Sequence, residues 1–167
     1  MASIYAKEPG IAAGLFIASR IFRRLNEQLV IELLCKDGDR VTSGAVIMRI
    51  EGPASDILKA ERTALNVLQR LSGIATQTGR YASELAGTHA KLLDTRKTTP
   101  GLRVLEKYAV RMGGGFNHRM GLFDGVLIKE NHIRAAGGIR EAIERARANI
   151  PPTIKIEVET TNLNEVE

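Results

Sequence analysis

Strand-like and helix-like segments alternate in the C-terminal half of the chain, and their spacing limits the fold more than any other feature. A unit that joins two parallel strands through a helix takes about thirty residues, which is the spacing seen here. A closed barrel of such units takes about 250 residues, and only about three of its strands fit between Lys91 and Glu167. The pattern predicts an α/β fold that stops part-way through a parallel barrel or an open parallel sheet. Strands are expected at 91–95, 125–129 and 154–159, and helices at 101–112 and 138–149.

The residues before this pattern predict a separate α/β subdomain with long connecting helices. We place the subdomain at 1–88 and the partial barrel, with its anion-binding site, at 89–167. Apolar residues at helical spacing follow Ala13, which is typical of an amphipathic helix. Strands are expected at 2–8, 29–35 and 45–50, and helices from 13, at 53–72 and, after a break at Ser72-Gly73, on to 87.

One stretch of this subdomain also resembles a different kind of protein. DGDRVTSGAVIMRIEG (37–52) is similar to the half-repeat of lipoyl and biotinyl carrier domains. Those carriers present a modifiable lysine on an exposed hairpin, whereas this segment runs into a predicted helix. A small α/β subdomain is therefore the favoured interpretation.

The composition argues against several classes of protein. The net charge of +5 permits nucleic-acid binding, but basic and acidic residues alternate and only 4% of residues are aromatic. No apolar run approaches the roughly 18 residues of a membrane span, and the N-terminus does not resemble a signal peptide. The single cysteine, Cys35, fits a reducing compartment, and its predicted strand indicates an inert, buried thiol. We expect a cytoplasmic protein that binds neither nucleic acid nor membranes.

Five cationic or ionisable side chains lie at positions where α/β folds carry their ligand-binding and catalytic residues. Arg96 and Lys97 follow one predicted strand and Lys129 ends another, and ligands bind at the C-terminal ends of parallel strands. His118 and Arg119 follow three glycines, where bare backbone can approach a ligand closely. Several positive groups at the same end of a parallel sheet repel one another unless an anion binds there. The stretch predicts a pocket for a small polyanion.

The residue types suggest how such an anion is held. Guanidinium groups match carboxylates, and lysines suit phosphates. Glu159 ends the last predicted strand, on the same face as Glu157, where a carboxylate can help to hold Mg²⁺ beside a phosphorylated substrate. Pairing of both glutamates with lysines explains them equally well. Read alone, Arg62 is a solvated arginine, and His118 is as readily a core histidine as a ligand.

Three segments closely resemble quinolinate phosphoribosyltransferase, also called nicotinate-nucleotide pyrophosphorylase (carboxylating). They are ERTALNVLQRLSGIATQT (61–78), DTRKTTPGLRVLEKYAVRMGGGFNHRMGLFDGVLIKENH (94–132) and KIEVET (155–160). The resemblance spans nearly the whole chain in the family's order. It implies phosphoribosyl transfer from phosphoribosyl pyrophosphate to quinolinate with decarboxylation. The products are nicotinate mononucleotide, pyrophosphate and CO₂, in Mg²⁺-dependent NAD biosynthesis.

The resemblance also implies roles for individual residues. Arg96, His118 and Arg119 grip the quinolinate carboxylates, and Lys97 and Lys129 hold phosphate groups. Glu159 faces the ribose and the metal, and Thr95 joins the substrate-binding set. Arg62 reaches the site of a neighbouring subunit, so a homodimer or higher homo-oligomer with shared active sites is implied. The implied catalytic residues are Lys97, Lys129 and Glu159.

Departures from the family leave alternatives open. The family is longer at both ends, with a further aspartate and late glycine-rich phosphate loops that this chain lacks. We expect the 167-residue chain alone to be inactive. A non-catalytic anion-binding or dimerisation fragment and a molybdenum-transport-associated paralogue are the alternatives, although Asp94 before TRKT favours the quinolinate enzyme. Nicotinate-accepting transferases that do not decarboxylate lack these motifs.

Overall fold

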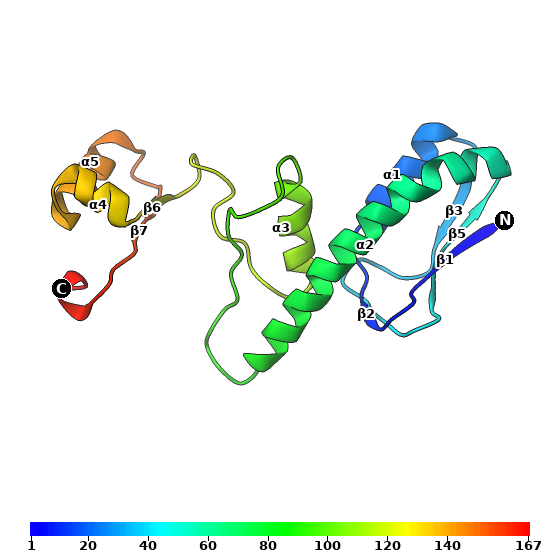
Figure 1. Cartoon of the computed structure of the whole chain (residues 1–167), viewed down its shortest axis with the longest axis horizontal. Helices are drawn as coiled ribbons and strands as arrows, with labels where there is room; N and C mark the ends of the chain where they lie inside the picture. Colours follow the sequence, from blue (N-terminus) through cyan, green and yellow to red (C-terminus); the bar gives the residue numbers. More distant parts are fainter. The chain divides into compact units, whose positions relative to one another are not determined.

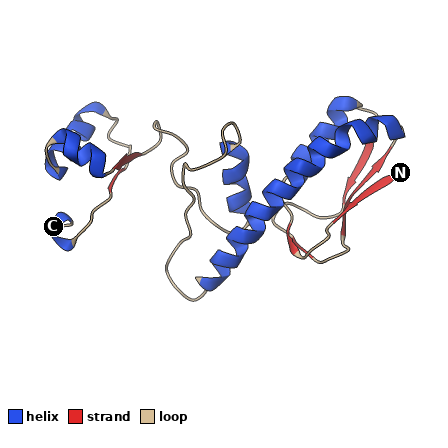
Figure 2. Cartoon of the chain, in the orientation of Figure 1, coloured by secondary structure: helices blue, strands red, loops and turns tan.

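The computed structural model describes every residue from Met1 to Glu167 and forms two compact units, Met1–His118 and Arg119–Glu167. Figure 1 labels the helices and strands, and Figure 2 distinguishes them by colour. No helix is long and apolar enough to cross a membrane. The first unit contains β1 (Ala2–Tyr5), β2 (Gly10–Ile11), α1 (Leu15–Leu25), β3 (Val30–Leu33), β4 (Arg40–Val41), β5 (Val46–Glu51), α2 (Ala54–Glu84) and α3 (Arg103–Met112). The second contains β6 (Val126–Ile128), α4 (Glu130–Ala136), α5 (Ile139–Asn149), β7 (Ile156–Val158) and a 3-10 helix (Leu163–Glu165).

The first unit is built on a three-stranded antiparallel sheet with β5 between β1 and β3. Side chains alternate along β5, so that Met48 and Ile50 are buried while Arg49 is exposed. Helices α1 and α2 run side by side against the sheet (Figure 1), and Phe22 of α1 and Ala64 of α2 complete the core. The predicted strands and the predicted helix from residue 13 are confirmed, with ends that differ by up to three residues. The 37–52 segment runs directly into α2, as expected for an α/β subdomain rather than a carrier.

The predicted break in the long helix at Ser72-Gly73 is wrong, because α2 continues through both residues to Glu84. The Ser72 hydroxyl accepts a hydrogen bond from the Ala13 amide at 3.0 Å and donates one to the Ala13 carbonyl at 3.3 Å. Gly73 lies on the exposed side of the helix, where a glycine costs only about 1 kcal/mol relative to alanine. Buried Leu71 and Ala75 on either side hold the helix in place.

The triple glycine allows a close approach, but to α2 rather than to open space. A Cβ atom on Gly113 would lie 2.3 Å from the Ala75 carbonyl oxygen, and one on Gly115 would lie 2.9 Å from Cγ2 of Thr78. Gly114 between them adopts φ +87°, which favours glycine. The glycines therefore let the chain after α3 pass directly over α2, and the sequence interpretation of a ligand-facing backbone misses this packing role.

The predicted strand at 91–95 is reduced to a single parallel bridge between Leu93 and Phe116. The Phe116 amide donates to the Leu92 carbonyl at 2.9 Å, and the Asp94 amide donates to the Phe116 carbonyl at 3.1 Å. The ladder stops there because the chain turns at Thr95, whose hydroxyl accepts from the Lys97 amide at 3.1 Å. The segment therefore runs parallel to its neighbour, as predicted, but it is too short to form a strand.

The second unit is a βαβ arrangement. Strands β6 and β7 pair in parallel, with Ile128 opposite Val158, and α4 and α5 connect them. The predicted strands and the helix at 138–149 are confirmed. Helix α4 was not predicted. The Nδ1 atom of His132 accepts from the Lys129 amide at 2.9 Å, so His132 caps the start of α4.

Candidate functional site

A buried carboxylate organises the part of the predicted site that lies in the first unit. Asp94 forms an ion pair with Lys107 of α3, and their side chains are 7% and 1% exposed. The same carboxylate accepts a hydrogen bond from the His118 amide at 2.8 Å. With its amide nitrogen turned toward these acceptors, Asn117 donates to Asp94 Oδ2 and to the Lys107 carbonyl, each at 2.9 Å. Asp94 thus joins three separate segments of the chain.

The loop after Asp94 carries the predicted substrate residues Thr95, Arg96 and Lys97. Thr95 and Lys97 are exposed, and the turn between them is closed by the Thr95 hydroxyl. Arg96 is half-buried, and its Nε is the only buried side-chain nitrogen or oxygen in the chain without a hydrogen-bond partner. Arg103 of α3 supports the loop by donating to the Thr98 hydroxyl at 3.1 Å. The loop is fixed at its base while the Arg96 guanidinium keeps an unused donor.

A second ion pair holds the far end of this loop against α3. Arg70 of α2 donates from Nε to the Glu106 carboxylate at 2.8 Å, and the Thr99 amide donates to the same carboxylate at 3.1 Å. Burial raises the pKa of Glu106, but the hydrogen bonds from Arg70 and Thr99 outweigh it, so that the pKa lies below its ordinary value. Glu106 is therefore ionised at neutral pH and anchors the loop.

Arg62 lies in the first half of α2 and is exposed, without a hydrogen bond or an ion pair. A solvated arginine would occupy such an exposed position. A side chain that contacts a second protein molecule would occupy it as well.

Two predicted residues of the second unit meet each other. Lys129 Nζ lies 2.7 Å from the Glu159 carboxylate, and both side chains are about half exposed. Their backbones are held by the parallel ladder, since the Glu159 amide donates to the Ile128 carbonyl at 2.9 Å. Arg119 donates from Nη1 to the Gly125 carbonyl at 3.1 Å. No cluster of three or more His, Cys, Asp or Glu side chains is placed to hold a metal ion. The lysine pairing considered for Glu159 from the sequence is present.

The structure thus brings Thr95, Arg96, Lys97 and His118 together around Asp94 in one unit, and Lys129 with Glu159 in the other. Sequence reasoning missed Lys107 and Asn117. Lys107 gives no periodic signal, since a lysine on a helix normally faces water. Asn117 stands next to His118 and Arg119, and only those two neighbours carry a charge signal in the sequence.

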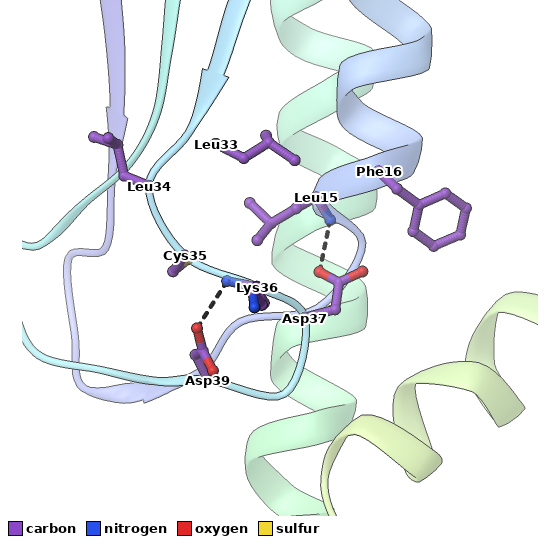
Figure 3. A pocket seen from close by; sticks show the side chains of 8 residues that line it. All are labelled: Leu15, Phe16, Leu33, Leu34, Cys35, Lys36, Asp37 and Asp39. Carbon is purple, nitrogen blue, oxygen red and sulfur yellow. Dashed lines mark hydrogen bonds between the residues drawn. The ribbon is translucent and has the colours of Figure 1, made fainter.

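A separate pocket of about 530 Å³ lies near the start of α1 (Figure 3). The Asp37 carboxylate lines this pocket. It accepts hydrogen bonds from the Leu15 amide at 2.9 Å and from the Tyr108 hydroxyl at 2.6 Å. A carboxylate at a helix N-terminus stabilises the helix, and here it also links α1 to α3. Burial raises the pKa of the Cys35 thiol, and the carboxylates of Asp39 and Asp37 raise it further. The thiol stays protonated and inert, and the pocket suits no polyanion.

Two family models cover the chain. The N-terminal domain of quinolinate phosphoribosyl transferase matches residues 1–72, and its C-terminal domain matches residues 74–167. The chain belongs to the quinolinate phosphoribosyl transferase family. The incomplete α/β barrel expected from the sequence is confirmed by this match and by the solved relatives. The predicted domain boundary after residue 88 stays a prediction.

Named relatives agree with this family. A Synechocystis protein named "probable nicotinate-nucleotide pyrophosphorylase (carboxylating)" is 49% identical over 162 residues, which cover 97% of this chain and 55% of the relative. A Bacillus subtilis protein of the same name is 52% identical over 158 residues, covering 95% and 55%. The solved nicotinate-nucleotide pyrophosphorylase of Francisella tularensis has a TM-score of 0.95 and 46% identity, covering 99% and 59%. The chain therefore spans little more than half the length of these relatives.

Proposed function

We propose that the full-length protein containing this chain transfers a phosphoribosyl group from phosphoribosyl pyrophosphate to the ring nitrogen of quinolinate. Decarboxylation then gives nicotinate mononucleotide, pyrophosphate and CO₂ for NAD biosynthesis. Family membership and the names of the relatives support the reaction class. Our expectations of a cytoplasmic location and of an inactive isolated 167-residue chain stay predictions.

The observation that carries the proposal is the unpartnered Nε of Arg96. A buried donor without an acceptor costs about 1–3 kcal/mol, so a fold keeps one only where something else supplies the acceptor. A guanidinium pairs best with a planar carboxylate that takes two parallel hydrogen bonds. Quinolinate has two adjacent carboxylates, and the first-unit donors proposed for them are Arg96, two residues after Asp94, and His118, whose amide donates to Asp94. Arg119 of the second unit is the third.

The remaining cations are assigned to the phosphorylated substrate. Lys97 is exposed and unpaired beside Arg96, and it suits a phosphate oxygen because a lysine acts as a compact charge. Lys129 would stabilise the departing pyrophosphate, and the Thr95 hydroxyl would add a polar contact. Fixed cations matter here because two polyanions must approach each other, and charge placed in advance offsets their repulsion.

Glu159 is proposed to face the ribose, where positive charge develops as pyrophosphate leaves. Its present partner, Lys129, holds the carboxylate 2.7 Å from the ammonium group. Mg²⁺ commonly binds through one or two carboxylates together with substrate phosphates, so a single glutamate is compatible with a magnesium ion brought in by the substrate. The ion would neutralise phosphate charge. Glu157 remains the alternative carboxylate.

Arg62 is proposed to serve the active site of a second subunit in a homodimer or larger homo-oligomer. Its exposed, unpaired position on α2 supports this assignment, since a side chain buried in its own unit could not reach a partner.

The test uses the full-length protein and calorimetric titration with quinolinate. Arg96→Lys keeps the charge but loses the planar pair of hydrogen bonds, and one charge-assisted bond is worth about 1.5–3 kcal/mol, so affinity should fall about tenfold or more. Arg111→Lys, on the exposed end of α3, is the matched control and should bind as wild type does. Unchanged binding by Arg96→Lys would remove this residue from the site. Quinolinate binding by the wild type without CO₂ release in the presence of phosphoribosyl pyrophosphate would indicate the non-catalytic alternative.

A further inference from the structure

Lys107 is the most deeply buried charged side chain in the protein. Its side chain is 1% exposed and its partner Asp94 is 7% exposed, whereas every other ion pair described above has at least one partner 45% exposed or more. Removing two charges from water is costly, and replacing such a pair by apolar groups is often neutral or stabilising. Fold stability alone therefore gives little reason for this pair.

The segments that the pair connects suggest another reason. One oxygen of Asp94 accepts from Lys107 Nζ and from the His118 amide, and the other accepts from Asn117. The residue directly after Asp94 begins the Thr95–Lys97 loop. Every hydrogen bond to this carboxylate thus fixes either the loop that carries the proposed cations or the backbone of the proposed histidine.

The sign of the charge matters as well. Asp94 is a carboxylate next to residues proposed to bind a dianion, and an unneutralised negative charge there would oppose the ligand. Lys107 approaches it from within α3 and cancels that charge without using a cation of the loop. Arg96 and Lys97 consequently remain available to an external anion.

We propose that the buried Asp94–Lys107 pair positions the anion site: Asp94 holds the His118 backbone and the Thr95–Lys97 loop together, and Lys107 neutralises Asp94 so that it does not oppose an anionic ligand. The inference rests on the proposed function for the identity of the ligand. Neither residue touches the substrate, so both are positioning residues.

The experiment compares Lys107→Met with the double variant Asp94→Asn/Lys107→Met in the full-length protein. Methionine keeps most of the volume of lysine but leaves Asp94 charged, so quinolinate affinity should fall about tenfold, mainly through KM rather than kcat. The double variant removes the charge while asparagine can still accept from the His118 amide. Its affinity should return to within about threefold of wild type.

Phe22→Leu, in the core of α1 and the sheet, is the matched control for a general loss of stability. It should lower the unfolding midpoint and leave quinolinate binding unchanged. Lys107→Met without ligand should show faster amide hydrogen exchange at 94–98 and 117–118 than in the rest of the first unit. Faster exchange across the whole unit, or an equal loss of affinity in Phe22→Leu, would show that the pair is only structural. A double variant as weak as the single one would refute the neutralising role of Lys107.

If Lys107→Met does not fold, Asn117→Ala tests the same proposal. Asn117 is exposed, so its replacement should cost the fold little stability. Local exchange at 117–118 should rise and quinolinate affinity should fall about threefold, whereas no change in either would overturn the proposal. If the wild type binds no quinolinate, the proposed function fails. The exchange pattern, measured without ligand, then still decides whether Asp94 and Lys107 order these segments.

Discussion

Replacing Gly113 with alanine is expected to destabilise the first unit, while replacing Gly73 with alanine is expected to stabilise it. Gly113 has φ −79°, an ordinary value, so alanine there meets no backbone strain. The added Cβ would instead lie 2.3 Å from the Ala75 carbonyl oxygen and 2.6 Å from Cβ of Thr78. Both neighbours are fixed by the continuous helix α2, so the clash must be relieved by moving the chain after α3.

The magnitudes follow from these surroundings. Overpacking of this kind costs about 1–3 kcal/mol, and the backbone carbonyl at Ala75 places Gly113→Ala in the upper part of that range. A Cβ on Gly73 meets nothing within 4 Å, so alanine there should add the ordinary helix preference of about 1 kcal/mol. Each variant adds one methyl group to wild type, and the free energies of unfolding of the two variants should differ by about 3–4 kcal/mol.

Urea unfolding of the full-length protein, followed by both far-ultraviolet circular dichroism and fluorescence, measures the difference. With a slope of about 2–3 kcal/mol per molar urea, the midpoints of the two variants should lie about 1–2 M apart, on opposite sides of wild type. Gly113→Ala should also weaken quinolinate binding, because Phe116 to His118 follow the displaced glycines. A Gly113→Ala protein that unfolds at the wild-type urea concentration or above would refute the packing account of the triple glycine.

Two further predictions concern ionised groups. The pKa of Glu106 lies below its ordinary value of 4.5, so its contribution to stability is complete above that value and is lost as the pH falls through the lowered pKa. Urea midpoints measured from pH of about 7 down to about 3 should therefore fall less steeply for Glu106→Gln than for wild type, and parallel curves would contradict the loop anchor. For the shared site, inactive Arg62→Ala and Lys97→Ala proteins are dissociated and reassociated together. About half of randomly paired dimers are mixed and each holds one intact site, so activity should recover to roughly a quarter of wild type. No recovery in dimers shown to have re-paired would place Arg62 in the site of its own chain.

The fold was largely predictable because most helices and strands have a recognisable pattern of apolar residues along the sequence. Buried Leu15, Ala18 and Phe22 repeat at helical spacing in α1, and the apolar residues before Lys129 form the predicted strand β6. The errors occurred where tertiary contacts overrode such signals. Ser72 looked like a helix end because serine competes for backbone hydrogen bonds, but its hydroxyl instead bonds Ala13, fifty-nine residues away. No local pattern contains that contact.

The candidate site divides in the same way. Arg96, Lys97 and His118 were predicted as candidates because each follows a strand-like run or a glycine, positions that carry ligands in α/β folds. The buried residues that hold these side chains in place were not predicted. Lys107, the partner of Asp94, lies thirteen residues away in α3, and its sequence context is that of an ordinary surface lysine. A helical lysine is predicted to be solvated because burying its charge is costly. Only the structure shows that Asp94 offsets this cost, and that the same carboxylate accepts from the His118 amide and so places the His118 backbone beside the arginine loop.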